Sequence, residues 1–267
     1  MRSLLVHASN DGTFESRLQV SLDLARRFDA HLTFLQTIAF DVVIPTDPFT
    51  IGGGELSALT KQRAEEFREQ VTARLGKEDV RWDWQVESGY DGATMTRHAS
   101  LNDLAVMGGG TEGVNTPLIG LLAIHCKAPL FVVPQDMQSF DAGGAAVICW
   151  NGSTEAARAM RASLPLLTAA AKVHLVAVGS EDDIDNHELP MTSAITYLGR
   201  HGVDCEAVTL PRGDEPVPET LRKAAMAREA AFMVMGAYGQ PRFFETLFGG
   251  VTRSILNDLP VPVLMAH

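Results

Sequence analysis

Short apolar runs recur along the chain, and stretches with helical periodicity separate them. In the first part, the run 4–7 leads through a polar turn and an amphipathic stretch at 15–28 into a second apolar run at 31–36. Short apolar runs joined by helices with apolar residues at i, i+3 and i+4 are typical of parallel strands that are buried on both faces and linked by right-handed crossovers. The pattern therefore predicts an α/β fold.

The pattern occurs twice, at nearly the same spacing. In the second part, the run 146–150 leads through a polar turn and a helical stretch at 155–168 into the run 172–178. Each part then closes on a short apolar strand beside a proline, at 129–133 and at 261–265. Because internal repetition marks repeated structural units, each part is predicted to follow the order β-α-β-α-β-α-β-α-β.

The chain of 267 residues is long enough for two domains of about 130 residues each. Residues 135–144 lie between the two parts and end in two glycines, as a short linker does. We therefore expect one domain at 1–140 and a second at 141–267. The first also holds an irregular segment at 40–54, with two prolines and three consecutive glycines. A tolerated surface loop is the favoured interpretation, and a flap or interface arm is the alternative.

The composition is that of an ordinary globular protein, with 46% hydrophobic and 21% charged residues. No transmembrane helix is expected, and the chain starts directly in a predicted strand without a secretory leader, so we expect a cytoplasmic location. The three cysteines, Cys126, Cys149 and Cys205, lie far apart. This spacing fits a reducing compartment and suggests neither a disulfide framework nor a zinc site.

The formal net charge of −11 argues against nucleic acids and anionic membranes as partners, because the long-range field of the protein repels them. A local basic pocket could still hold a phosphate. The eight histidines show no close ligand spacing such as His-x-x-x-His, so no metal site is predicted.

Ligands of doubly wound sheets bind beyond the carboxyl ends of the strands, where the strand order reverses, so the loops after the first and fourth strands are the candidate sites. In the second half, the loop after the fourth strand holds Gly236 and Gly239, then nine residues, then Gly249 and Gly250. Glycines let the main chain approach a ligand and present its N–H groups to a phosphate. A helix expected at 251–257 would direct the positive end of its dipole at the same anion.

A Gly-x-x-Gly, nine residues, and a glycine followed by Ser or Thr mark the nucleotide-binding branch of the universal stress protein family, and this sequence resembles that family. Gly236, Gly239 and Gly249 match at that spacing, and residues 150–153 (Trp-Asn-Gly-Ser) occupy the place of the family's aspartate-containing turn. The resemblance covers nearly the whole chain as two copies. It implies two tandem flavodoxin-like domains of the adenine nucleotide alpha hydrolase-like type, each a five-stranded parallel sheet in the order 3-2-1-4-5 with helices on both faces.

The resemblance also implies that the last strands of the two domains meet across a pseudo-two-fold axis, which makes one chain equivalent to a family dimer. Further pairing into a homodimer is left open. The implied ligand is an adenine nucleotide, ATP or AMP, with magnesium as a further candidate. Asn151 and Val178 would face the adenine and ribose, and Met235 and Gly236 would lie at the ribose edge. The complete set of candidate cofactor-binding residues is Trp150, Asn151, Ser153, Val178, Met235, Gly236, Gly239, Arg242, Gly249, Gly250, Val251 and Thr252.

Two positions depart from the family pattern. Gly250 stands where the family has Ser or Thr, which removes one hydroxyl donor to a phosphate, although Thr252 could supply another. Asn151 replaces the usual aspartate. Each lost hydrogen bond weakens binding by about 0.5 to 1.5 kcal/mol without necessarily abolishing it. Arg242 could compensate by pairing with phosphate, and a solvated loop arginine is an equal alternative. Ser153 is interpreted as a helix cap rather than a nucleophile.

In the first half, the corresponding glycines are Gly108, Gly109, Gly110 and Gly113, followed by a shortened stretch to Gly120. The nine-residue spacing is not kept, so we interpret the first half as a degenerate copy retained for its dimer-like interface.

The implied function is that of a stress-response nucleotide sensor or regulatory protein with a regulatory protein partner. The sequence has no Walker-type Gly-Lys-Ser/Thr, so no enzyme activity beyond slow ATP hydrolysis is expected. The alternative is a nucleotide-independent protein interaction module with vestigial loops. An adenylating enzyme of the related hydrolase group is the least favoured alternative, because the sequence indicates no second substrate pocket and no catalytic pair.

Overall fold

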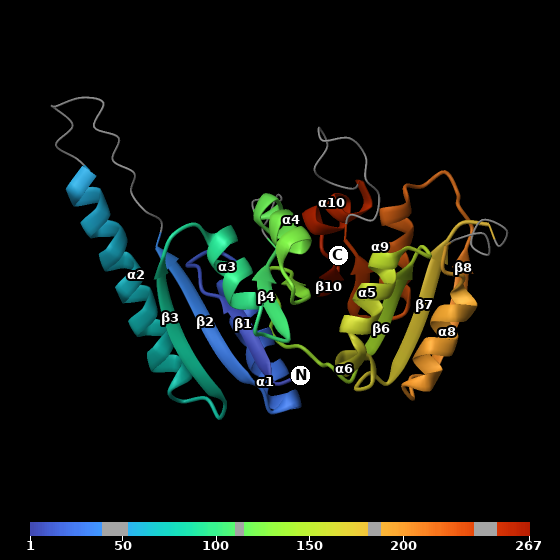
Figure 1. Ribbon diagram of the computed structural model, residues 1–267, viewed down its shortest axis with the longest axis horizontal. Helices are drawn as coiled ribbons and strands as arrows, with labels where there is room; N and C mark the ends of the chain where they lie inside the picture. Colours follow the sequence, from blue (N-terminus) through green and yellow to red (C-terminus); the bar gives the residue numbers. More distant parts are fainter. Residues whose placement is uncertain (39–52, 110–114, 181–187, 238–249) are drawn as a thin grey trace.

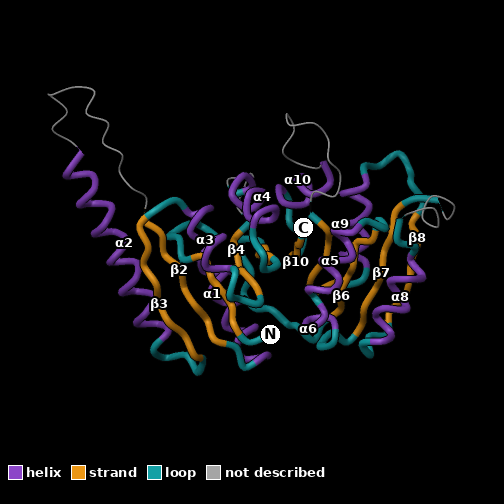
Figure 2. Tube along the Cα trace, in the orientation of Figure 1, coloured by secondary structure: helices purple, strands orange, loops and turns teal. Residues whose placement is uncertain are grey.

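The structure is a computed structural model that describes residues 1–38, 53–109, 115–180, 188–237 and 250–267. Figures 1 and 2 show two halves arranged side by side, with strands in the middle and helices around them. None of the described helices is long and apolar enough to cross a membrane.

The first half contains five strands and four helices within the described residues. They are β1 (Ser3–His7), α1 (Phe14–Phe28), β2 (His31–Ile38), α2 (Gly53–Leu75), β3 (Arg81–Ser88), α3 (Asp91–Ala99), β4 (Leu104–Gly108), α4 (Thr116–His125) and β5 (Leu130–Val133).

The second half repeats this order. Its elements are β6 (Ala145–Trp150), α5 (Thr154–Ala162), α6 (Leu164–Leu167), β7 (Lys172–Val178), α8 (Met191–Arg200), β8 (Cys205–Leu210), α9 (Val217–Ala227), β9 (Ala230–Gly236), α10 (Gly250–Asn257) and β10 (Val263–Ala266).

The helical stretch expected at 155–168 is divided at Ser163 into α5 and α6. Pro165 lies in the first turn of α6, where its missing N–H costs nothing, whereas inside a continuous helix it would remove a main-chain hydrogen bond and clash with the preceding turn. The proline therefore sets the break.

All ten strands form one sheet in the order β3-β2-β1-β4-β5-β10-β9-β6-β7-β8. Within each half the strands are parallel and follow the predicted order 3-2-1-4-5. The halves join where β5 and β10 pair antiparallel, with Val263 opposite Val132 and Met265 opposite Leu130. The predicted meeting of the two last strands is thus confirmed, and the complete sheet is mixed rather than parallel.

Two apolar layers cover the sheet along its whole length. One layer packs α1, α2, α5, α6 and α8 on one face, and the other packs α3, α4, α9 and α10 on the opposite face. Neighbouring strand residues alternate between the layers: Leu4 and Val6 belong to the first, and Leu5 belongs to the second. This alternation explains why the strands read as continuous apolar runs, because both faces are buried.

The segment between the halves packs against both of them. Phe140 is buried, and its ring lies 5.3 Å from that of Phe131 on β5 and 6.1 Å from that of Phe232 on β9. Its main-chain N–H donates to Asp23 on α1 at 2.9 Å. The predicted linker therefore contributes to the shared core, while the domain boundary itself stays a prediction.

Candidate functional site

The carboxyl ends of β6 and β9 form the switch point of the second half. β6 pairs with β7 on one side and with β9 on the other. The strand order therefore reverses at β6, and the connections that follow β6 and β9 run to opposite sides of this point. Trp150, Val178 and Gly236 are the last residues of β6, β7 and β9, and Met235 precedes Gly236. The structure therefore brings these four predicted residues to one edge of the sheet, as the sequence pattern requires.

Asn151 and Ser153 organise the start of α5. The Asn151 Oδ1 atom accepts hydrogen bonds from the main-chain N of Ser153 at 3.3 Å and from its Oγ at 2.8 Å. The Ser153 Oγ in turn accepts from the main-chain N of Ala156 at 3.1 Å, so the predicted helix cap is confirmed. Asn151 is exposed, and its Nδ2 amide donates to no residue that the structure describes.

Gly236 allows the end of β9 to lie directly against the start of α5. A Cβ atom at this position would lie 2.6 Å from the main-chain N of Ala156 and 2.7 Å from the carbonyl carbon of Glu155. Both neighbours are backbone atoms, so a side chain could fit only if strand and helix separated. The glycine is thus required by this close approach, independently of any ligand.

Trp150 is buried, with 4% of its surface exposed, and its indole Nε1 donates to the carbonyl of Leu189 at 3.2 Å. Leu189 in turn donates its main-chain N–H to the carbonyl of Gly152 at 3.0 Å. These two hydrogen bonds therefore hold the segment before α8 against the end of β6 and the turn that follows it. Sequence reasoning missed Leu189, because no local pattern marks it.

Gly250 is the first described residue of α10. It is exposed, and a Cβ atom there would meet no atom of the described residues within 4 Å apart from its chain neighbours and the backbone of α10. Val251 is half-buried and Thr252 is buried, so the helix turns its next two residues towards the protein. Gly239, Arg242 and Gly249 of the predicted set lie outside the described residues, as does most of the irregular segment 40–54.

Arg222 on α9 holds the other end of α10. Its side chain is 8% exposed, and its Nε donates to the carbonyl of Asp258 at 2.9 Å. Its Nη2 donates to the carbonyl of Ser254 and to the Ser254 Oγ, the latter at 3.2 Å. Buried guanidinium groups are stable only when their donors are matched in this way. Arg222 was not among the predicted residues.

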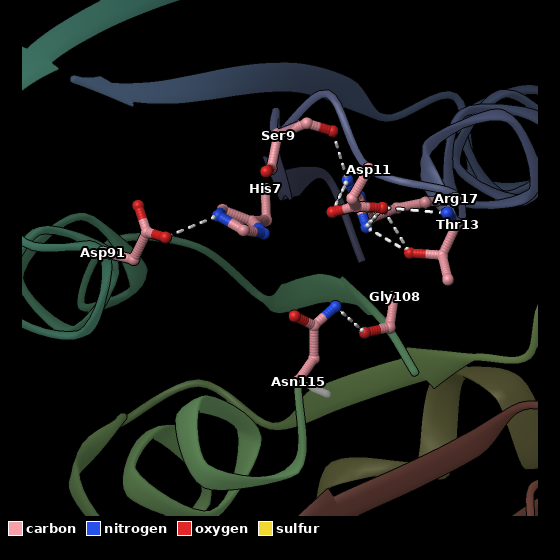
Figure 3. Close-up of polar contacts among 8 residues, drawn as sticks. All are labelled: His7, Ser9, Asp11, Thr13, Arg17, Asp91, Gly108 and Asn115. Carbon is pink, nitrogen blue, oxygen red and sulfur yellow. Dashed lines mark hydrogen bonds and ion pairs between the residues drawn. The ribbon is translucent and has the colours of Figure 1, made fainter. Parts of the chain in front are cut away.

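In the first half, the corresponding region lies at the carboxyl ends of β1 and β4, and we call this region in each half the corner. The first-half corner contains a buried guanidinium (Figure 3). Arg17 on α1 has no exposed surface, and its Nη2 donates to the carbonyl of Ser9 at 3.0 Å and to Asp11 Oδ2 at 3.2 Å. Its Nη1 donates to the Thr13 Oγ1 at 2.9 Å. Asp11 Oδ1 accepts from both the main-chain N and the Oγ1 of Thr13, at 2.9 and 2.6 Å.

The Arg17 charge stabilises the ionised form of Asp11. Burial by itself would raise the pKa of Asp11, but the positive charge of Arg17 and the hydrogen bonds from Thr13 and Arg17 outweigh burial and hold this pKa below the ordinary value for aspartate. The pair is therefore an ion pair at neutral pH.

Gly108 ends β4 directly beneath this ion pair. A Cβ atom on Gly108 would lie 1.9 Å from the Thr13 Oγ1 and 2.3 Å from the Arg17 Nη1. Asn115 donates to the Gly108 carbonyl at 3.1 Å, and buried His7 lies with its Nε2 3.5 Å from Asp91 Oδ2 (Figure 3). Side chains of the first half therefore pack closely around the end of β4.

Among the described residues, no group of three or more His, Cys, Asp or Glu side chains is arranged to hold a metal ion. Burial raises the pKa of the Cys149 thiol to about 12, which disfavours the reactive thiolate at neutral pH.

A known protein family matches the second half of the chain. Residues 146–267 match the model of the family described as "Universal stress protein family". The second half of the chain belongs to the universal stress protein family. No curated protein matches the sequence.

Solved structures support the same universal stress protein architecture over the whole chain. A universal stress protein from Archaeoglobus fulgidus superposes with a TM-score of 0.75 at 14% identity, covering 99% of this chain and 95% of that one. A functionally unknown protein from Pseudomonas aeruginosa gives a TM-score of 0.59 at 14% identity, covering 100% of this chain and 92% of that one. At these identities the likeness shows the tandem fold.

A universal stress protein family protein from Arabidopsis thaliana with AMP bound also matches, over 46% of this chain and 90% of that one, at 16% identity and a TM-score of 0.34. A score this low supports no transfer of the ligand to this chain. For this chain, nucleotide binding therefore has to be argued from the site itself.

Proposed function

We propose that the second half binds an adenine nucleotide, ATP or AMP, at the carboxyl ends of β6 and β9, and that the protein acts as a stress-response nucleotide sensor or regulatory protein. The observation that carries the proposal is the exposed first described turn of α10. Gly250 is exposed, and a Cβ atom there would meet no atom of the described residues within 4 Å. The N–H groups of a helix's first turn favour phosphate.

The described residues near the starts of α5 and α10 suggest how the nucleotide would be oriented. The phosphates would lie at Gly250, Val251 and Thr252, where the positive end of the α10 dipole adds to main-chain donors. The adenosine would lie towards Asn151 and Val178. Asn151 keeps its Oδ1 in the turn and its Nδ2 available, so it would donate a hydrogen bond where an aspartate would accept one.

We further propose that binding, rather than turnover, is the activity, with ATP hydrolysis at most slow. A nucleotide held by main-chain N–H groups and a helix dipole is positioned without a base to activate water. Magnesium would then be bound through the phosphates of the ligand. A nucleotide-dependent contact with a regulatory protein would convert occupancy into a signal.

Position 250 offers a direct test. Gly250→Asp places a negative charge at the proposed phosphate site, where a Cβ atom meets no atom of the described residues within 4 Å, and Asp is also favourable at the start of a helix. Gly250→Asn is the matched neutral control of the same size. We expect Gly250→Asp to lower ATP affinity more than ten-fold relative to Gly250→Asn, because like charges then lie within a few ångströms.

Native mass spectrometry of protein purified without added nucleotide would first detect a bound ligand, and calorimetric titration with ATP and magnesium would measure the affinities. Gly250→Ser restores the hydroxyl of the family pattern and is expected to tighten ATP binding by about three-fold. Equal ATP affinity in Gly250→Asp and Gly250→Asn would place the phosphates elsewhere. No binding to the wild type at millimolar ATP would refute the proposal and leave the nucleotide-independent interaction module.

A further inference from the structure

The helices that follow the fourth strand of each half meet where the halves join. α4 begins after the loop that follows β4, and α10 begins after the loop that follows β9. The two helices are in contact, and Figure 1 shows them side by side at the centre of the molecule. The helix at the proposed phosphate site therefore packs against an element of the other half.

Two contacts define this junction. The Thr116 Oγ1, on the first residue of α4, donates to the Asn257 Oδ1, on the last residue of α10, at 3.2 Å. Leu259, just beyond α10, lies against the main chain of Gly109, where a Cβ atom would be 2.2 Å from the Leu259 Cδ1. The end of α10 is thus in contact with two described residues of the first half, Gly109 and Thr116.

The first-half residues at this junction are themselves fixed. Asn115 donates to the Gly108 carbonyl at 3.1 Å, and the main-chain N of Gly109 donates to the Val133 carbonyl on β5 at 2.8 Å. Gly108 in turn packs beneath Arg17. A rigid support of this kind limits the positions that the attached helix can adopt, because packed contacts have few alternative arrangements.

We infer that Gly109 and Thr116 of the first half are positioning residues for the phosphate end of the second-half site, acting through Leu259 and Asn257 on α10. The inference has two parts. The first, that the first half fixes α10, stands on the contacts alone. The second, that this fixing tightens nucleotide binding, rests on the proposed function. The glycine run that resembles a degenerate phosphate loop thereby has a mechanical role, since Gly109 is the residue that admits Leu259.

Thr116→Val removes the hydroxyl and keeps the shape of the side chain, and Thr116→Ser restores the hydroxyl. Gly109→Ala forces Leu259 to move. The matched control is Ser3→Ala, which removes a similar hydroxyl-to-amide hydrogen bond, Ser3 Oγ to Asn102 Oδ1 at 2.7 Å, within the first half at the amino end of β1. All variants are made in the full chain.

Hydrogen exchange of residues 250–257 in nucleotide-free protein tests the first part. We expect faster exchange in Thr116→Val and Gly109→Ala, and wild-type exchange in Thr116→Ser and Ser3→Ala. Calorimetric titration with ATP and with adenosine tests the second part. We expect Thr116→Val to raise the Kd for ATP roughly three-fold to ten-fold and to leave the Kd for adenosine within about two-fold, because only the phosphates contact α10.

Unchanged exchange in both variants would overturn the inference, whatever the nucleotide affinities. Faster exchange with equal losses of ATP and adenosine affinity would show a general loosening and would overturn the positioning role. If the wild type binds no nucleotide, the proposed function fails by that result alone, and hydrogen exchange still decides whether the first half fixes α10.

Discussion

The two halves differ in the residues that pack at the corner between the carboxyl ends of their first and fourth strands. In the first half, Arg17 lies completely buried above Gly108 and pairs with Asp11. In the second half, the start of α5 lies against Gly236 without a buried cation, and α5 carries Ala157 at the position that Arg17 holds in α1, the fourth of the helix. The same corner of the fold is thus packed by charged side chains in one half and by the backbone of a helix start in the other.

The turn after the first strand shows how small the difference in sequence is. Asp11 and Asn151 each fold back on the hydroxyl residue two positions later, Thr13 and Ser153, with the same pair of hydrogen bonds. The second oxygen of Asp11 then pairs with Arg17. Asn151 has a neutral amide at this position, and among the described residues no basic side chain pairs with it.

The largest effect is expected when the ion pair of the first-half corner is broken. Asp11→Ala leaves Arg17 buried without its counter-charge, so we expect the free energy of unfolding to fall by about 3 to 5 kcal/mol. Asn151→Ala, at the exposed equivalent position, should cost roughly 1 kcal/mol or less. Urea denaturation of both variants measures the difference. Losses of similar size would mean that the two corners are energetically alike.

The two glycines that end the fourth strands should be equally intolerant of a side chain, for different reasons. Gly236→Ala collides with backbone atoms of α5, and Gly108→Ala collides with Thr13 and Arg17. We expect each to lower stability by about 1 to 3 kcal/mol, and Gly236→Ala, which lies at the proposed site itself, to weaken ATP binding more than Gly108→Ala.

Gly199→Ala in α8 is the control for the glycine variants, because its new methyl group meets no neighbour within 4 Å. It should raise stability by about 0.4 to 1 kcal/mol, since alanine restricts the unfolded chain. If denaturant midpoints showed Gly236→Ala to be as stable as Gly199→Ala, the close approach of β9 and α5 would not constrain the site.

The smallest expected effect is on the pH dependence of stability in acid. The pKa of Asp11 is lower in the folded protein than in the unfolded chain, so its contribution to stability is present above the unfolded pKa of about 3.9 and is lost as the pH falls through the folded pKa. The double variant Asp11→Leu/Arg17→Met removes this dependence. Denaturation curves below about pH 4 should be less pH-sensitive for the double variant than for the wild type, and parallel curves would contradict this assignment.

Much of the fold could be predicted because it depends on local patterns. The repeated apolar runs indicated two parallel sheets, and the order of each sheet and the pairing of the last strands, β5 and β10, followed from the family resemblance. Pro165 could have indicated the break between α5 and α6, since proline is unfavourable inside a helix. The residues of the second-half switch point were located for the same reason, because they end strands or begin helices.

The contacts that fix the two corners could not be predicted in this way. Arg17 and Arg222 lie in amphipathic helices, where an arginine is ordinarily exposed, and their burial depends on acceptors supplied by other segments. Leu259 and Leu189 are single apolar residues in connections, and nothing in their neighbours indicates what they contact. Such partners are set by tertiary packing, which a one-dimensional pattern does not contain.

The antiparallel joint between β5 and β10 has a consequence for how the protein assembles. Two separate subunits must find each other at their cellular concentration, whereas here the docked connection around Phe140 keeps the two surfaces together at a high effective concentration. The joint can therefore persist on modest intrinsic affinity, and the two partners are never exchanged for identical copies. Covalent pairing thus frees each half from matching a two-fold-related copy of itself, so the two halves can diverge in sequence.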